Sequence, residues 1–160
     1  MLFGLPPEPV VNVHVFISLI GIASGLVVLR GMIHNRRLDT MTPVFLVSTI
    51  LTSLTGFLFP LTPFGPAHVI GVLSLVALAV AVVARYPRDL AGGWRLAWVI
   101  AAVVSLHLNV FVGVVQAFRK LPPLQGLAPT ESEPPFAIAQ GLVLLAFVWL
   151  GVLAARRFRP

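Results

Sequence analysis

The fold is most strongly indicated by residues 94–118, which have the sequence WRLAWVIAAVVSLHLNVFVGVVQAF. Apart from Arg95 near its beginning, this stretch carries no charged residue. At a rise of about 1.5 Å per residue, about 20 apolar residues in a helix cross the roughly 30 Å hydrocarbon core of a bilayer. Residues 94–118 therefore predict a membrane-spanning helix.

Four further segments have the same apolar character, at residues 10–29, 43–59, 67–83 and 136–155. The composition agrees, because 58% hydrophobic and 10% charged residues, with a mean hydropathy of +1.00, leave too little polar surface for a water-soluble globule of 160 residues. The sequence thus predicts an all-helical integral membrane bundle with five transmembrane helices. We expect residues 1–160 to form a single domain.

The basic residues predict the orientation of this bundle. Nine of the 11 Lys and Arg residues follow the first, third or fifth segment: Arg30, Arg36, Arg37, Arg85, Arg88, Arg95, Arg156, Arg157 and Arg159. By the positive-inside rule, the C-terminus lies in the cytoplasm and the N-terminus outside, in a multi-pass protein of the inner (plasma) membrane. We expect Tyr86, Trp94 and Trp98 to anchor the cytoplasmic interface. Because topology accounts for the formal charge of +6, no nucleic-acid partner is predicted.

Several function classes are disfavoured by residues that the sequence lacks. With no cysteine, the chain forms no disulfide, no thiolate metal site and no covalent c-type haem attachment. No Asp, Glu, Lys or Arg lies well within a predicted span, although proton-coupled carriers, voltage sensors and retinal proteins use such residues. We therefore predict no catalytic residues and do not expect a stand-alone enzyme. A channel or carrier is the weakest hypothesis.

Two histidines are predicted near the outer surface. His14 lies toward the outer end of the first span, on the helix face of Gly21 and Gly25, and His68 lies at the outer start of the third span. A haem with two axial histidines needs both at a common depth. One hypothesis is therefore that His14 and His68 are metal ligands of one b-type haem, or another metal centre, between the first and third helices. The alternative, two interfacial histidines bonded to water or backbone, is the more common situation.

His107 is predicted near the membrane midplane, because it lies 12 residues from both Arg95 and Arg119, or about 18 Å from each. Asn109 is about 200° away around the same helix, which indicates that protein covers both sides of this helix. His107 and Asn109 are therefore candidate cofactor-binding residues at a buried site or a quinone pocket. Hydrogen bonds to a neighbouring helix or a buried water are the alternative interpretation.

A second functional hypothesis belongs to another class. Small and hydroxyl-bearing residues form stripes suited to close helix packing and to hydrogen bonds between helices, at Gly21 and Gly25 and again at Thr49, Thr52, Ser53 and Gly56. The proline-rich stretch 119–134 is either an ordered exterior loop with a docking surface or a plain connector. Together these features fit a non-catalytic structural or assembly subunit of a larger membrane complex. The first functional hypothesis, which rests on the histidines described above, is a redox-associated electron-transfer subunit.

Two parts of the chain resemble small polytopic bacterial inner-membrane proteins of uncharacterised function. They are residues 14–30 with 46–60, and the segment that includes LNVFV at 108–112 and APTESEPPF at 128–136. This resemblance implies a membrane location and no activity. The histidines at helix ends are also loosely similar to those of membrane b-type cytochromes, which implies haem b as a possible cofactor. Such proteins have two ligand pairs on four helices, whereas this sequence offers at most one pair.

Overall fold

A computed structural model describes residues 7–58 and 65–160 of the chain. Its elements are α1 (Pro7–Ile33), α2 (Met41–Gly56), α3 (Pro66–Arg85), α4 (Trp94–Lys120), α5 (Pro122–Gln125) and α6 (Pro134–Arg157). The described residues form no strand, so the all-helical prediction is confirmed. Four helices, α1, α3, α4 and α6, are long and apolar enough to cross a membrane, and α2 is shorter at 16 residues. The predicted end of the second span, Phe59, lies outside the described residues.

Prolines set several helix boundaries. Pro66, Pro122 and Pro134 occupy the first positions of α3, α5 and α6, where a missing backbone N–H breaks no helical hydrogen bond. Leu121 is extended, with φ −91° and ψ 115°, because a residue before proline is disfavoured in the helical conformation. α4 therefore ends at Lys120, and the chain leaves the bundle there.

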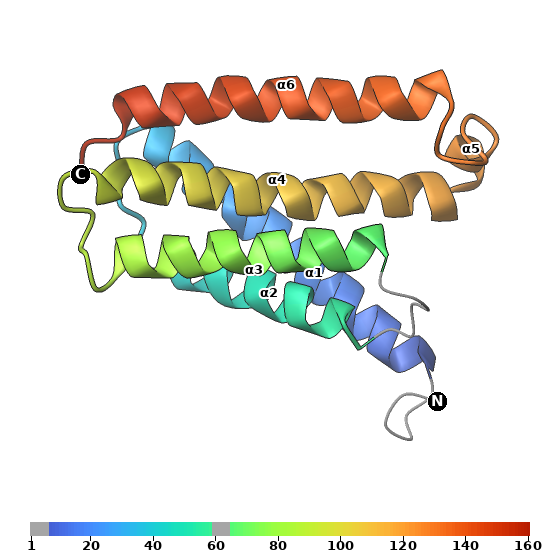
Figure 1. The fold of residues 1–160 in the computed structure, drawn as a ribbon, viewed down its shortest axis with the longest axis horizontal. Coiled ribbons are helices and arrows are strands. Elements are labelled where there is room, and N and C mark those ends of the chain that lie inside the picture. Colours follow the sequence, from blue (N-terminus) through green and yellow to red (C-terminus); the bar gives the residue numbers. More distant parts are fainter. Residues whose placement is uncertain (1–6, 59–64) are drawn as a thin grey trace.

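The long helices alternate in direction along the bundle. Figure 1 shows the beginning of α1 and the short helix α5 at one end, and at the opposite end the C-terminus with the α1–α2 and α3–α4 connections. All nine arginines assigned above to one side of the membrane thus lie at this second end, which we call the basic end. Basic residues follow every second apolar segment of the sequence, and because the helices alternate in direction, these residues collect at one end of the bundle.

α4 is the central helix, as the sequence predicts. It packs against α1, α2, α3, α5 and α6 (Figure 1), and the core includes its residues Val99 and Leu106. Trp98 departs from the interfacial position expected for it, because it is only 1% exposed and lies in the core beneath the Arg85 guanidinium. Tyr86 remains exposed, in agreement with an interfacial role.

The glycines of α1 allow close contact with two neighbouring helices. A Cβ atom added at Gly25 would lie 2.5 Å from Leu106 Cδ1 of α4 and 2.8 Å from Phe45 Cδ2 of α2. The small-residue face therefore brings helices together, and protein side chains fill the space beside it. Hydrogen bonding between helices is also present, because Ser53 Oγ of α2 donates to Ser74 Oγ of α3 at 3.1 Å.

Ion pairs hold the two loops of the basic end together. Arg85, at the end of α3, pairs with Asp39 and donates to the Arg37 carbonyl oxygen at 2.8 Å. Arg37 in turn pairs with Asp89 of the α3–α4 connection. The α1–α2 and α3–α4 connections are thus joined by charge pairs at the level where the helices leave the apolar part of the bundle.

Candidate functional site

His14 and His68 both lie beside the end of α2. His14 Nδ1 is 2.7 Å from Thr55 Oγ1, a hydrogen bond that joins α1 to the last turn of α2. His68 Nδ1 accepts the backbone N–H of Gly65 at 3.1 Å, and its ring centroid is 5.7 Å from that of Phe57. The structure therefore places the two imidazoles at the same end of the bundle, with hydrogen bonds to the protein.

The helices that carry the two histidines, α1 and α3, are not neighbours in the bundle. In the described part of the chain these two helices make no contact, and each packs against α2. Phe45 of α2 lies against Gly25 of α1, and the ring of Phe57, the residue directly after α2, would lie 2.9 Å from a Cβ atom added at Gly71 of α3.

Haem binding by His14 and His68 stays a prediction, which absorption spectra of the purified protein test. A Soret band lost in both His14→Ala and His68→Ala would support it. Among the described residues, no group of three or more His, Cys, Asp and Glu residues is arranged to hold a metal ion.

His107 lies between α4 and α6, beside an apolar groove of about 200 Å³. Its ring centroid is 5.3 Å from that of Phe147 on α6, and the groove is also lined by Val103, Leu144 and Gly151. His107 is the one polar residue in this lining, and its Nδ1 atom is buried without a hydrogen-bond partner in the described structure. The groove is thus an apolar surface with one imidazole in its wall, and the Nδ1 atom of that imidazole is shielded from solvent.

Asn109 lies on the opposite side of α4, toward α1 and α2. Its Nδ2 atom and Thr49 Oγ1 are each 3.0 Å from the point that a Cβ atom of Gly21 would occupy. Neither atom has a hydrogen-bond partner among the described residues, and both side chains are buried. A bridging water would satisfy them, as buried waters do elsewhere. His107 and Asn109 therefore belong to two separate sites, as their angular separation indicated.

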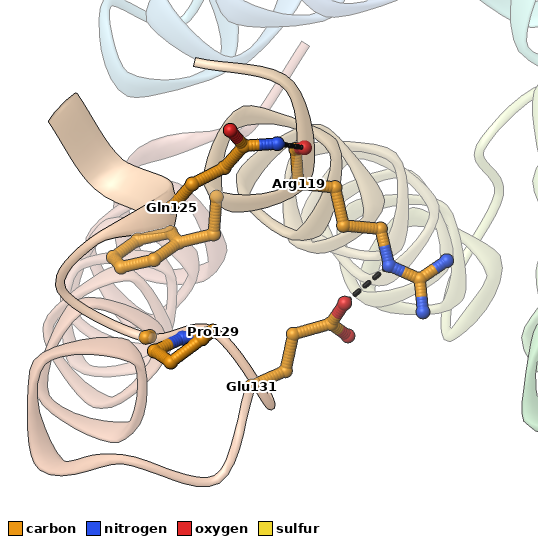
Figure 2. A pocket seen from close by; sticks show the side chains of 6 residues that line it. Arg119, Gln125, Pro129 and Glu131 are labelled. Carbon is orange, nitrogen blue, oxygen red and sulfur yellow. Dashed lines mark hydrogen bonds and ion pairs between the residues drawn. The ribbon is translucent and has the colours of Figure 1, made fainter. Parts of the chain in front are cut away.

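The stretch 119–134 is a folded segment that includes the short helix α5. Figure 2 shows Arg119 paired with Glu131, and Gln125 Nε2 donating to the Arg119 carbonyl oxygen. These residues line a cavity of about 410 Å³ at the end of α4. Desolvation acts to raise the pKa of Glu133, but hydrogen bonds from the Thr130 hydroxyl and from backbone N–H groups, including those of Thr130 and Ser132, together outweigh it and lower the pKa below its usual value. The side chains around this cavity hold the segment in place.

Comparison with protein-family models, with curated proteins and with solved structures finds no match to this chain. The resemblances described above therefore stay predictions. The candidate functional site is the groove at His107, because its one polar side chain has a buried nitrogen without a partner among the described residues, at the predicted depth of the membrane midplane.

Proposed function

We propose that the chain is a five-span protein of the inner (plasma) membrane, with its C-terminus in the cytoplasm, and that it acts as a non-catalytic subunit of a larger membrane complex. The alternating helix directions and the collection of nine arginines at the basic end support this orientation. α2 counts as the fifth span: its 16 residues cover about 24 Å, and a bilayer accommodates a short span by local thinning.

The observation that carries the subunit function is the unpartnered Nδ1 atom of His107. A polar nitrogen without a hydrogen bond in hydrocarbon is costly, so a neighbouring group is expected to satisfy it. Lipid headgroups lie too far away, because His107 is about 18 Å from either helix end. The missing partner must therefore be embedded at the same depth.

The groove fits a helix of another subunit. Its lining is apolar apart from His107, as a surface packed against a second transmembrane helix would be. Its volume of about 200 Å³ is below the roughly 300–1,000 Å³ of ordinary small-molecule pockets, and it matches a few inserted side chains. We propose that the occupant is a transmembrane helix carrying a hydroxyl or amide side chain opposite His107.

Site-specific photocrosslinking in native membranes tests the proposal. A crosslinker at Val148, which lines the groove, should give one defined product, whereas the same group at Leu145, which is 66% exposed and outside the groove lining, should not. His107→Leu should reduce the Val148 product by roughly threefold to 20-fold, since an interhelical hydrogen bond contributes about 0.6–1.7 kcal/mol. Leu145→Ala serves as the matched control and should leave the product unchanged.

Three outcomes would contradict the proposal. The first is a Val148 product that is unaffected by His107→Leu, and the second is wild-type protein without any crosslinked partner. The third is a quinone recovered from the purified wild-type protein and lost in His107→Leu, which would make the groove a quinone site. Reporter tags on the two termini test the topology separately, and tags found in the same compartment would refute the odd number of spans.

A further inference from the structure

Five arginines at the basic end have no partner in the described structure. Of the nine arginines there, two pair with aspartates, Arg95 Nη1 donates to the Phe158 carbonyl oxygen at 2.6 Å, and Arg88 lies 5.0 Å above the Trp94 ring. The other five are exposed, and their side chains make no ion pair or hydrogen bond with described residues: Arg30, Arg36, Arg156, Arg157 and Arg159. We call these five residues the arginine surface.

Tertiary contacts bring the arginine surface together from opposite ends of the sequence. The last turn of α1 and the end of α6 lie side by side (Figure 1), and the backbone N–H of Arg159 donates to Asn35 Oδ1 at 2.6 Å. The C-terminal segment is further fixed by Phe158, which is 1% exposed and part of the core. The two segments that carry these arginines are therefore held side by side before any ligand binds.

The charge of this surface is uncompensated. The chain has two aspartates, Asp39 and Asp89, and both are engaged by Arg37 and Arg85. Clustered cations without acidic partners raise the local concentration of anions. Guanidinium groups bind phosphate oxygens through paired hydrogen bonds, and basic surfaces at the ends of transmembrane helices attract anionic lipid headgroups.

We propose that the arginine surface is a binding site for the phosphate group of an anionic phospholipid, in the seam between the ends of α1 and α6. The proposal requires that the bundle lies in a membrane, and it is independent of any partner at His107. Arginines that served only to orient the chain would bind phosphate weakly, and lysines in their place would bind it equally well. The proposed site instead saturates with lipid and requires the guanidinium group of arginine.

Native mass spectrometry of the detergent-solubilised protein, titrated with phosphatidylglycerol or phosphatidylcholine, measures this binding. At about 1 kcal/mol per arginine near anionic lipid, Arg36→Gln with Arg157→Gln should weaken phosphatidylglycerol binding about 30-fold. Arg36→Lys with Arg157→Lys keeps the charge, and hence the orientation, and should lose affinity several-fold because lysine lacks the guanidinium fork. Arg119→Gln with Lys120→Gln, at the opposite end of the bundle, is the control and should bind normally.

Inorganic phosphate in the same titration distinguishes a lipid site from a site for the free ion, and it should fail to displace the lipid. The melting temperature without added lipid shows whether each variant is folded. The proposal is overturned if phosphatidylcholine binds as tightly as phosphatidylglycerol, if the glutamine pair binds normally, if the control loses as much affinity, or if free phosphate displaces the lipid.

Discussion

Gly25→Ala tests the packing at the centre of the bundle. The added methyl would lie 2.5 Å from Leu106 Cδ1 and 2.8 Å from Phe45 Cδ2, well inside van der Waals contact. Both neighbours are 1% exposed, so neither side chain has free space into which to move. Overpacking of this kind costs about 1–3 kcal/mol. For a chain of this size, that corresponds to a decrease of roughly 2–12 °C in melting temperature.

The matched control is Gly141→Ala on α6, because a Cβ atom there has no neighbour within 4 Å. This control should be neutral or slightly stabilising, since alanine favours a helix more than glycine does. Thermal unfolding of the two variants in the same detergent, followed by the loss of monodisperse protein, measures the difference between them.

A double variant makes the test specific to the proposed contact. Leu106→Ala alone should destabilise the bundle by about 2–5 kcal/mol, because it leaves a cavity. In the double variant with Gly25→Ala, the truncated side chain makes room for the new methyl. The double variant should therefore lose less unfolding free energy than the sum of the two single variants, by about 0.5–3 kcal/mol. Equal melting temperatures for Gly25→Ala and Gly141→Ala, or strict additivity in the double variant, would refute this arrangement of α1, α2 and α4.

Two further predictions concern charged groups outside the apolar part of the bundle. Asp39→Asn should cost about 1 kcal/mol in unfolding free energy, because it removes the carboxylate that pairs with Arg85, which is 3% exposed. Asp89→Asn, which breaks an exposed pair, should cost less than about 0.5 kcal/mol, and equal losses in thermal unfolding would contradict the burial argument. Because the pKa of Glu133 is lowered, its hydrogen bonds stabilise the segment fully at pH values above the usual carboxyl pKa. This stabilisation is lost as the pH falls through the lowered pKa. An NMR titration should therefore show Glu133 ionising below its ordinary pKa of 4.5, and Thr130→Ala should move the value upward.

Local patterns were sufficient to predict which segments are helical and how they alternate. Hydrophobic length set the helices, prolines set several of their ends, and arginine positions set which connections share an end of the bundle. The angular separation of His107 and Asn109 also placed them correctly on two sides of α4. These properties depend on residues close together in the chain, so a single sequence contains them.

Lateral neighbours could not be predicted in the same way. The depths of His14 and His68 follow from helix length, but a sequence does not show that α2 lies between their helices and fills the glycine faces with Phe45 and Phe57. The burial of Trp98, expected at the interface, arises for the same reason, because the guanidinium of Arg85 lies above its ring. The residues near Arg85 in the sequence do not indicate that it is buried and paired, because its partner Asp39 is 46 residues away.

The amino-acid sequence is therefore enough to establish a helical, membrane-type bundle with one basic end, because hydropathy, proline positions and charge act over one helix or one loop. The pairing of helices is a property of the folded chain: each helix has several apolar faces of similar hydrophobicity, and the choice among them depends on how side chains from distant segments fit together. That fit left His107 facing an open groove and gathered the arginine surface from the two ends of the chain.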